Sequence, residues 1–511
     1  MQPPSNNPKT KKLLLSVLLW AALTILFLLV LGGFTSNAEG NQTTKLLFGM
    51  ADAGVGYLDQ DWMANTIDPL PVFSWIVEFT YRYLGEWMFY VYVFLLLGIY
   101  LYSVMMILDH FFQINQSALL FFMAIALFLL SYSNMWSLPV KDWLQYGVAY
   151  QNLSLPRFLP NAFAVLFFPS ILLFLKKRPY WAVVVLALAC NIHTGYMIIG
   201  AVLVSAYLIA DLWENRDLKR VLMIGGLALV LVLPIVVIFV FANQGASAEQ
   251  IAEANHIVAN LRIPHHTQVS VWWGRSAMVK LVLVLAAIVV MRRTKMLPIL
   301  VIGFLMTYGP ALVLIIRPSN RIALLQLWRV SVILVPLASA LLIGALVSLV
   351  YRKFEGSLLR WRWVIVVLLS GLVAVTLVFG TGKWIERVSG YGKLPGSGLM
   401  GYVEEHGGPG EIYLIPPKDD ALEPFRVVTG EPVYVNWKSH PWNTLELLEW
   451  YRRMGVAEGF YAAAAEERCA MLAGELAGIT HVVLPAGETL DCPLVERTFA
   501  NQAYSLYLLQ P

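Results

Sequence analysis

The chain has 511 residues, of which 59% are hydrophobic and only 13% are charged, and its formal net charge is +4. Soluble proteins contain about 45–50% apolar and about 25% charged residues, and a single soluble core stops growing at roughly 250–300 residues. The composition therefore excludes a soluble globular protein and a disordered chain, and the small net charge gives no support for a nucleic-acid partner. We expect an α-helical multi-pass membrane protein.

Eleven apolar runs are predicted to be membrane helices. The first follows three lysines and has no small-residue cleavage site after it, so we expect it to be retained rather than removed as a signal peptide. The runs cover residues 13–33, 87–108, 117–132, 161–175, 181–192, 194–210, 221–242, 276–291, 296–316, 327–349 and 363–382.

The region 181–210 could form one long helix or two short ones. One long helix would reverse every later span and would place the basic residues 292–295 on the opposite side. We expect two short helices that turn near His193, although residues 181–192 at about 1.5 Å each are too short to cross a core of about 30 Å by themselves.

Basic loops orient the predicted bundle. Residues 176–178, 216–220, 292–295 and 352–362 are rich in Lys and Arg and fall on the side of the N-terminus when eleven spans are assumed. The long loop 34–86 falls on the other side, with seven acidic residues against Lys45 and Arg82. We therefore expect a cytoplasmic N-terminus and a large first outer loop.

The composition changes after residue 382. Residues 383–511 hold seventeen acidic and ten basic residues and contain no predicted span. Alternating strands and helices are typical of a small α/β domain, so we divide the chain into a membrane domain, 1–382, and an extracytoplasmic α/β domain, 383–511. The three cysteines show no metal-type spacing, but Cys469 and Cys492 could form a disulfide. Strand-like runs cover 411–416, 432–436 and 480–485, and helical periodicity covers 443–455 and 459–477.

Two carboxylates in the first outer loop are candidate catalytic residues. Asp59 and Asp61 lie two residues apart in a turn-like setting, where they could share a divalent cation such as Mg²⁺ or Mn²⁺, or divide the roles of base and ligand. The alternative is a solvated acidic loop. We expect the neighbouring Asp52 and Asp68 to be solvated.

Histidines form the second group of candidates. The adjacent His265 and His266 could ligate a metal, bind a phosphate or move a proton, with Arg262 and Arg275 as polar groups of the same outer loop. The alternative is an interfacial turn with an aromatic belt, since Trp272 and Trp273 follow. His193, at the predicted hairpin turn, either faces a cavity or is a hydrogen-bonded structural residue.

Arginines at the start of the tenth span form a candidate anion site. Arg317, Arg321 and Arg329 lie on a face where Lys and Arg are normally sparse, and the guanidinium fork matches phosphate geometry. On a continuous helix Arg321 and Arg329 would share one face about 12 Å apart. The alternative is that they reach lipid headgroups.

A further loop, 132–160, combines aromatic rings with amides and charges. Such a surface suits a carbohydrate, although an interfacial amphipathic helix has the same composition. The residues concerned are Asn134, Trp136, Lys141, Asp142, Trp143, Tyr150, Gln151, Asn152 and Arg157.

The layout of spans, the long first outer loop with Asp59-Gln60-Asp61 and the C-terminal extracytoplasmic domain together resemble the GT-C superfamily of membrane glycosyltransferases. The tail also resembles an uncharacterised domain found on bacterial multi-pass proteins, in segments 425–430, 433–438, 441–442 and 449–453. The two resemblances together imply a GT-C-like bundle of about eleven transmembrane helices in a bacterial plasma membrane.

The GT-C resemblance also implies a function. A sugar would pass from a polyprenyl-phosphate-linked donor to a glycan, lipid or protein acceptor on the outer side, with inversion, in the assembly of a cell-envelope polysaccharide. Asp59 or Asp61 would act as general base or metal ligand, the arginines would neutralise the lipid phosphate, and His265 and His266 would assist.

Two non-enzymatic functions remain as alternatives. A transporter or flippase of lipid-linked glycans would share the cavity and the arginines, but it has less use for an acidic pair and often shows two related halves, which this sequence lacks. A scaffold for envelope assembly would use the C-terminal domain as its binding module.

Overall fold

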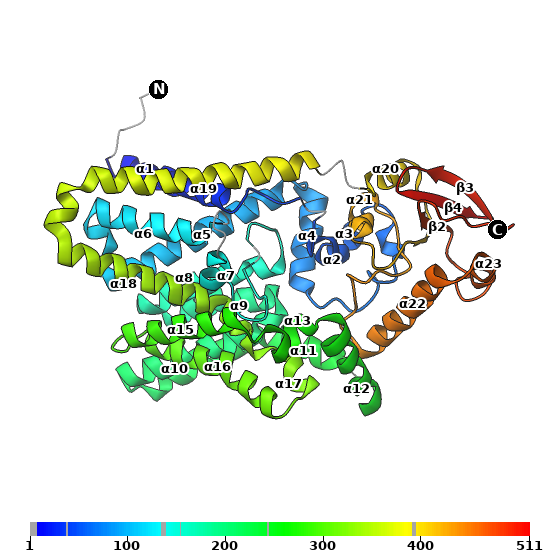
Figure 1. Ribbon diagram of the computed structural model, residues 1–511. Coiled ribbons are helices and arrows are strands. Elements are labelled where there is room, and N and C mark those ends of the chain that lie inside the picture. The colour runs from blue at the N-terminus through cyan, green and yellow to red at the C-terminus, as the bar shows by residue number, and fades with distance from the viewer. Residues whose placement is uncertain are drawn as a thin grey trace, which may run out of the picture.

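The computed structural model describes residues 8–36, 39–133, 139–153, 155–242, 245–390 and 395–510. Long helices form one elongated bundle, and the C-terminal domain sits at one end of it (Figure 1). We refer to that end as the domain side. Asn134 and Trp136, which belong to the predicted carbohydrate surface, lie outside the described residues.

Every predicted apolar run is helical in the structure, and the membrane fold is confirmed. Seven of the described helices are long and apolar enough to cross a membrane, and the remaining runs form shorter helices. The bundle consists of α1 (Pro8–Val30), α5 (Met88–Phe112), α6 (Ala118–Ser131), α8 (Phe167–Leu175), α9 (Pro179–Ile192), α10 (Met197–Asn215), α11 (Leu218–Ala242), α15 (Arg275–Val290), α16 (Leu297–Ile316), α18 (Ser331–Arg360) and α19 (Arg362–Gly390).

The region 181–210 forms two helices, as expected. Helix α9 ends at Ile192, and the backbone of His193 leaves the helical region with φ −127° and ψ 98°. A single 3₁₀ turn, η4 (Thr194–Tyr196), then leads directly into α10. The turn lies on the domain side, where it contributes to the site described below.

Short helices fill the loops of the domain side. The first loop folds into α2 (Gln42–Lys45), α3 (Leu47–Ala53), η1 (Leu58–Gln60) and α4 (Pro71–Tyr83). Helices α3 and α4 approach closely at Gly49, where an added Cβ would lie 2.4 Å from the Ser74 carbonyl oxygen. The other loops hold α7 (Val140–Gln145), η3 (Pro160–Leu166), α12 (Ala248–His256), the π-helical turn η5 (Ile257–Arg262), α13 (Pro264–Thr267), α14 (Val269–Trp272), α17 (Asn320–Leu324) and η6 (Leu327–Val330).

The C-terminal domain contains helices and one four-stranded sheet with strand order β1-β2-β4-β3. Strands β1 and β2 are parallel, with Tyr413 opposite His481, and the other pairs are antiparallel. The predicted strand 432–436 contributes only an isolated bridge between Tyr413 and Val433, and the β3–β4 hairpin was not predicted. The elements are α20 (Ser397–His406), β1 (Tyr413–Leu414), η8 (Asp420–Leu422), α21 (Phe425–Thr429), α22 (Thr444–Ala462), α23 (Ala465–Ala473), β2 (His481–Pro485), β3 (Val495–Ala500) and β4 (Tyr504–Leu509).

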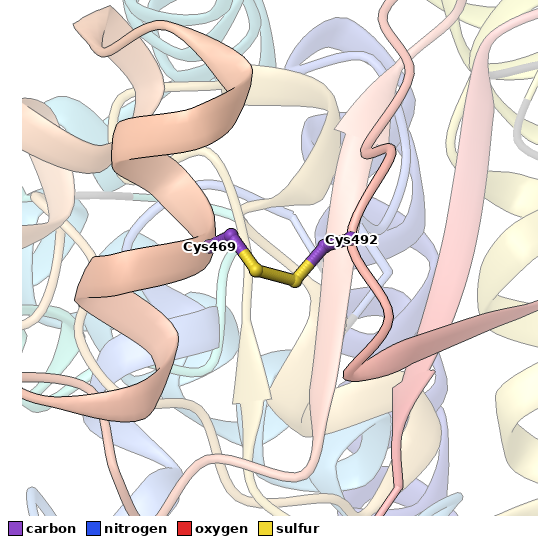
Figure 2. The surroundings of a disulfide bond; sticks show 2 residues. All are labelled: Cys469 and Cys492. Carbon is purple, nitrogen blue, oxygen red and sulfur yellow. A yellow bond between two sulfur atoms is a disulfide. The ribbon is translucent and has the colours of Figure 1, made fainter.

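A disulfide joins Cys469 to Cys492, so the suggested pairing is confirmed. It links α23 to the segment that precedes β3 (Figure 2). Cys190, in α9, is a free and buried thiol.

Candidate functional site

Asp61 is buried and holds the C-terminal domain. Its side chain is 0% exposed, and its Oδ2 accepts hydrogen bonds from Arg426 Nε (2.6 Å) and from the Val433 backbone amide (2.8 Å). Its Oδ1 accepts from the amides of Met63 (2.8 Å) and Ala64 (3.3 Å). Both oxygens are thus occupied by protein donors, and the alternative of a solvated acidic loop does not hold for Asp61.

Asp59 has a different environment from Asp61. It lies in η1, its side chain is exposed, and its carbonyl oxygen accepts a hydrogen bond from Asn65 Nδ2 (2.7 Å). Among the described parts of the chain, no group of three or more His, Cys, Asp or Glu residues could hold a metal ion. Because Asp61 is saturated and Asp59 faces solvent, this pair does not fit a shared divalent cation.

Further contacts fix the C-terminal domain to the first loop. Gly56 approaches Gly430 so closely that an added Cβ would lie 2.4 Å from the Gly430 carbonyl oxygen, and that oxygen accepts a hydrogen bond from the Tyr57 amide (2.8 Å). The Ile67 amide donates to both carboxylate oxygens of Glu446 (3.1 Å each). These bonds make the domain a fixed cover for this side of the bundle.

A polar network runs inward from the loop after α12. Nδ1 of His266 lies 2.7 Å from the Ala149 carbonyl oxygen and must carry the proton of that hydrogen bond, because a carbonyl only accepts. Gln151 Nε2 lies 3.2 Å from the same nitrogen and donates to Gln326 Oε1 (3.3 Å). Gln326 in turn accepts from Arg329 Nη2. The network therefore orients the Arg329 guanidinium.

Strained backbone supports this network. Ala149 and Tyr150 both have left-handed φ values, 53° and 58°, and Gln326 has φ 45°. Such conformations cost about 1–3 kcal/mol each in a non-glycine residue and cluster at functional sites. Here they direct the Ala149 carbonyl at His266 and place the Gln326 side chain against Arg329.

The α9–α10 turn forms the opposite wall. The Gly195 amide donates to His193 Nδ1 (3.1 Å), and the His193 ring stacks on Tyr196 at 4.2 Å. Arg329 Nη1 donates to the Gly195 carbonyl oxygen (3.5 Å), and a Cβ on Gly195 would lie 2.1 Å from that nitrogen. Thr194 Oγ1 donates to the Pro69 carbonyl oxygen (3.1 Å), which ties the first loop to the turn.

Cations gather where these walls meet. Burial lowers the pKa of Lys45, and the charges of Arg329 and Arg262 lower it further, whereas Asp68 opposes them. Lys45 forms no side-chain hydrogen bond or ion pair with the described residues. Burial also raises the pKa of Asp68, which lies beside Lys45 and is not solvated as expected. We call Lys45, Asp68, Arg262, Arg329 and His266 the cationic site.

The C-terminal domain reaches this site. Arg262 Nη2 donates to the Lys438 carbonyl oxygen (2.9 Å), and its guanidinium lies 5.4 Å from the Trp437 ring centre. Burial, followed by repulsion from Arg262, lowers the pKa of His440 to about 3, and Lys45 adds to that repulsion. The domain therefore contributes part of the wall.

The histidines at the cationic site are neutral at physiological pH. Burial lowers the pKa of His266 to about 4, and the charges of His265, Arg329 and Arg262 act in the same direction. Burial also lowers the pKa of His265. In this structure His266 is a neutral ring that donates from Nδ1 to the Ala149 carbonyl oxygen rather than presenting a positive charge.

Three predicted arginines lie away from the cationic site. Arg317 and Arg321 are exposed, and Arg275 is exposed with its guanidinium 5.8 Å from the Trp143 ring centre. Arg321 and Arg329 do not share one face, because the continuous helix on which that prediction depended is absent: α17 ends at Leu324 and Gln326 adopts a left-handed conformation before η6. The break turns Arg329 inward.

Sequence reasoning missed Lys45 and His440 and misjudged Asp68. Lys45 is one of only two basic residues in the acidic loop 34–86, and this was a usable signal, because an isolated cation on an acidic face needs a partner. No sequence signal placed His440, which reaches the site only through docking of a domain encoded far along the chain.

Comparisons with known proteins agree with this architecture. Residues 397–457 match the family described as Domain of unknown function (DUF6798), and no curated protein matches the chain. Among solved structures, the fold is similar to that of ArnT from Cupriavidus metallidurans, which was crystallised bound to undecaprenyl phosphate. The TM-score is 0.51 at 13% sequence identity, over 96% of this chain and 97% of ArnT. The membrane fold is thus ArnT-like along nearly its whole length, as the GT-C resemblance implied.

Proposed function

We propose that this chain is a membrane glycosyltransferase that moves a sugar from a polyprenyl-phosphate-linked donor to an acceptor on the outer side of a bacterial plasma membrane. The observation that carries the proposal is the cationic site, an inward-facing group of positive charges under a fixed domain. The ArnT-like fold supports it, because that structure was determined with undecaprenyl phosphate bound.

Arg329 and Lys45 are suited to hold the donor phosphate. The Arg329 Nε is buried and has no hydrogen-bond partner among the described residues, while Gln326 and the Gly195 carbonyl hold the rest of the guanidinium. Lys45 supplies a second charge that forms no ion pair with the described residues. Guanidinium groups bind phosphate with charge-assisted hydrogen bonds, and a preorganised cation would stabilise the departing lipid phosphate.

Asp68 is the carboxylate that the geometry favours as general base. Inverting transfer needs one base to take the proton of the acceptor hydroxyl from within about 3 Å. Asp68 lies near Lys45 and has a raised pKa, and its Oδ1 accepts a hydrogen bond from the Leu70 amide (2.7 Å). By contrast, both Asp61 oxygens are occupied and Asp59 faces solvent. A carboxylate with a raised pKa is better matched to proton transfer near neutral pH.

The central test is transfer from radiolabelled polyprenyl-phosphate sugars by purified full-length protein. Asp68→Asn should lower the rate by about 10²–10⁴-fold, the usual range for a lost acid–base group. Asp59→Asn provides the comparison, because the sequence alone suggested Asp59 as the general base. A larger loss of rate in Asp59→Asn than in Asp68→Asn would identify Asp59 as the base instead.

Donor binding is tested separately with free polyprenyl phosphate as competitor. Arg329→Ala should weaken competition roughly 10–100-fold, because a hydrogen bond to a charged group contributes about 1.5–3 kcal/mol. Arg329→Lys should weaken it less, since Lys keeps the charge but lacks the fork. Arg352→Ala, exposed at the far end of α18, is the matched control. Equal competition in the parent and both Arg329 variants would show that the donor phosphate does not bind at Arg329.

A further inference from the structure

A second group of cations lies on the domain side, apart from the cationic site. Burial lowers the pKa of Lys141 to about 8, and the charges of Lys383, Arg157 and Arg387 lower it further. An added Cβ would lie 3.9 Å from Arg387 Nη2 at Gly32 and 3.8 Å from Arg157 Nη1 at Gly40, whereas Arg329 of the cationic site contacts Gly195 and Gln326. We call Lys141, Arg157, Lys383 and Arg387 the α1–α19 cluster.

Only part of this positive charge is neutralised within the described residues. Arg387 Nε pairs with Glu39 Oε2 at 3.6 Å, and its Nη1 donates to the carbonyl oxygens of Gly32 (3.1 Å) and Phe34 (3.4 Å). Asp142, next to Lys141, is already bound to Lys280 (2.9 Å). Lys141, Arg157 and Lys383 form no ion pair with the described residues.

A small pocket lies beside the cluster and is lined by Val30, Gly32, Ser133, Thr376, Phe379, Gly380 and Lys383. Its walls come from α1 and α19, which run side by side (Figure 1). The helices touch at Gly380, where an added Cβ would lie 1.9 Å from the Leu29 carbonyl oxygen. Phe379 is 53% exposed, so this wall faces the membrane.

The cations without ion pairs and the apolar wall beside them fit a ligand with an anionic head and an apolar body. Cations brought together without carboxylates repel one another, and an anion between them relieves that repulsion. Lys383 lies at the end of an apolar wall, so a ligand that reached it from the bilayer would leave its acyl chains against Phe379. A soluble anion would gain nothing from that wall.

We propose that the α1–α19 cluster binds the phosphate of an anionic membrane lipid, at a site separate from the cationic site. Lys383 and Arg157 contact the phosphate, Arg387 is held in place by Glu39, and the lipid chains lie along α19. This proposal does not rest on the transfer reaction, because a lipid bound here would be retained by a protein with no activity.

The test uses full-length protein in nanodiscs of phosphatidylcholine with a minor fraction of phosphatidic acid, and retained lipid is measured by native mass spectrometry. Lys383→Gln and Arg157→Gln should each lower retention of phosphatidic acid about tenfold, the loss expected for one charge-assisted hydrogen bond. Lys383 is exposed, so its replacement should not disturb folding. Arg352→Gln, an exposed cation at the opposite end of the bundle, should retain parental binding.

Two further measurements distinguish a lipid phosphate from free phosphate and test the role of charge. Inorganic phosphate should not displace the lipid at equal concentration, and phosphatidylcholine should not be retained. With phosphatidylglycerol, a phosphodiester that does not titrate near neutral pH, in place of phosphatidic acid, retention should fall as the pH rises through about 8 in the parent. The reason is that Lys141 loses its proton there while Lys383, Arg157, Arg387 and the ring of Tyr146 surround it. Lys141→Arg should abolish that pH dependence. Equal loss in Arg352→Gln, displacement by inorganic phosphate, or retention that is unchanged in both Lys383→Gln and Arg157→Gln would overturn the proposal.

Discussion

Glu431 is a buried carboxyl group whose ionisation opposes folding of the C-terminal domain. It is 2% exposed, and its Oε2 has no hydrogen-bond partner within the part of the chain that the structure describes. Burial, followed by repulsion from Glu411, raises its pKa to about 7. The group is therefore neutral in the folded domain at mildly acidic pH but ionised in the unfolded chain above about pH 4.3.

The sign of the resulting pH dependence follows from linkage. A raised carboxyl pKa contributes stability that is fully present below about pH 4.3 and is lost as the pH rises through about 7. Glu431→Gln should therefore raise the melting temperature at pH 8 more than at pH 5.5. The corresponding gain in the free energy of unfolding is at most about 3 kcal/mol. Intrinsic fluorescence during heating measures this, with the exposed Glu404→Gln as control. An equal effect at both pH values would contradict the assignment.

At the scale of elements, the contact between the first loop and α21 depends on one buried ion pair. Asp61→Asn removes the negative charge that balances the buried Arg426 guanidinium, which also donates to the Val433 carbonyl oxygen (2.9 Å). Breaking one side of a buried pair costs roughly 3–5 kcal/mol, so we expect a lower melting temperature and faster proteolysis between α19 and α20.

Asp59→Asn is the matched control for that experiment, because it makes the same chemical change on an exposed side chain of the same turn. It should leave proteolysis unchanged. A normal melting temperature and protease resistance in Asp61→Asn would show that docking does not need the pair. Loss of transfer in Asp61→Asn alone would therefore not identify a catalytic residue.

The elements that were predictable from the sequence are those set by local apolar pattern. The eleven apolar runs and the break at His193 follow from hydropathy, span length and charge asymmetry. The break at Gln326 was not predictable, because its left-handed backbone is held by contacts with Gln151 and Arg329 that come from distant segments. The β3–β4 hairpin was missed because its exposed face lacks the usual alternation.

The candidate site also contains residues that the sequence indicated and residues that it could not indicate. Arg329, Arg262 and His266 carry a charge or ring that is conspicuous near a membrane, so the sequence indicated them. The burial of Asp61 depends on Arg426, 365 residues later, and His440 depends on the same docking. Long-range contacts of this kind have no signature in one sequence.

At the scale of the whole molecule, the structure requires the first loop and the C-terminal domain to lie on one side of the membrane. Cysteine variants at the exposed Asn41 and Glu466 should both react with a membrane-impermeant maleimide in intact cells, whereas a cysteine at Lys353 should not. The native cysteines should not react with the maleimide, because Cys190 is buried and the other two form the disulfide. Labelling of only one of the first two positions would contradict the docked arrangement.

The ion pair between Asp61 and Arg426 also sets the order of assembly. The carboxylate is synthesised at the start of the chain, and its guanidinium partner follows 365 residues later. At about 5–20 residues per second, the first loop waits roughly 20–70 s while every later helix is inserted. Any chain that terminates before residue 426 leaves the loop permanently without its partner, so Asp61 stays exposed and the undocked loop is open to proteases of the cell envelope.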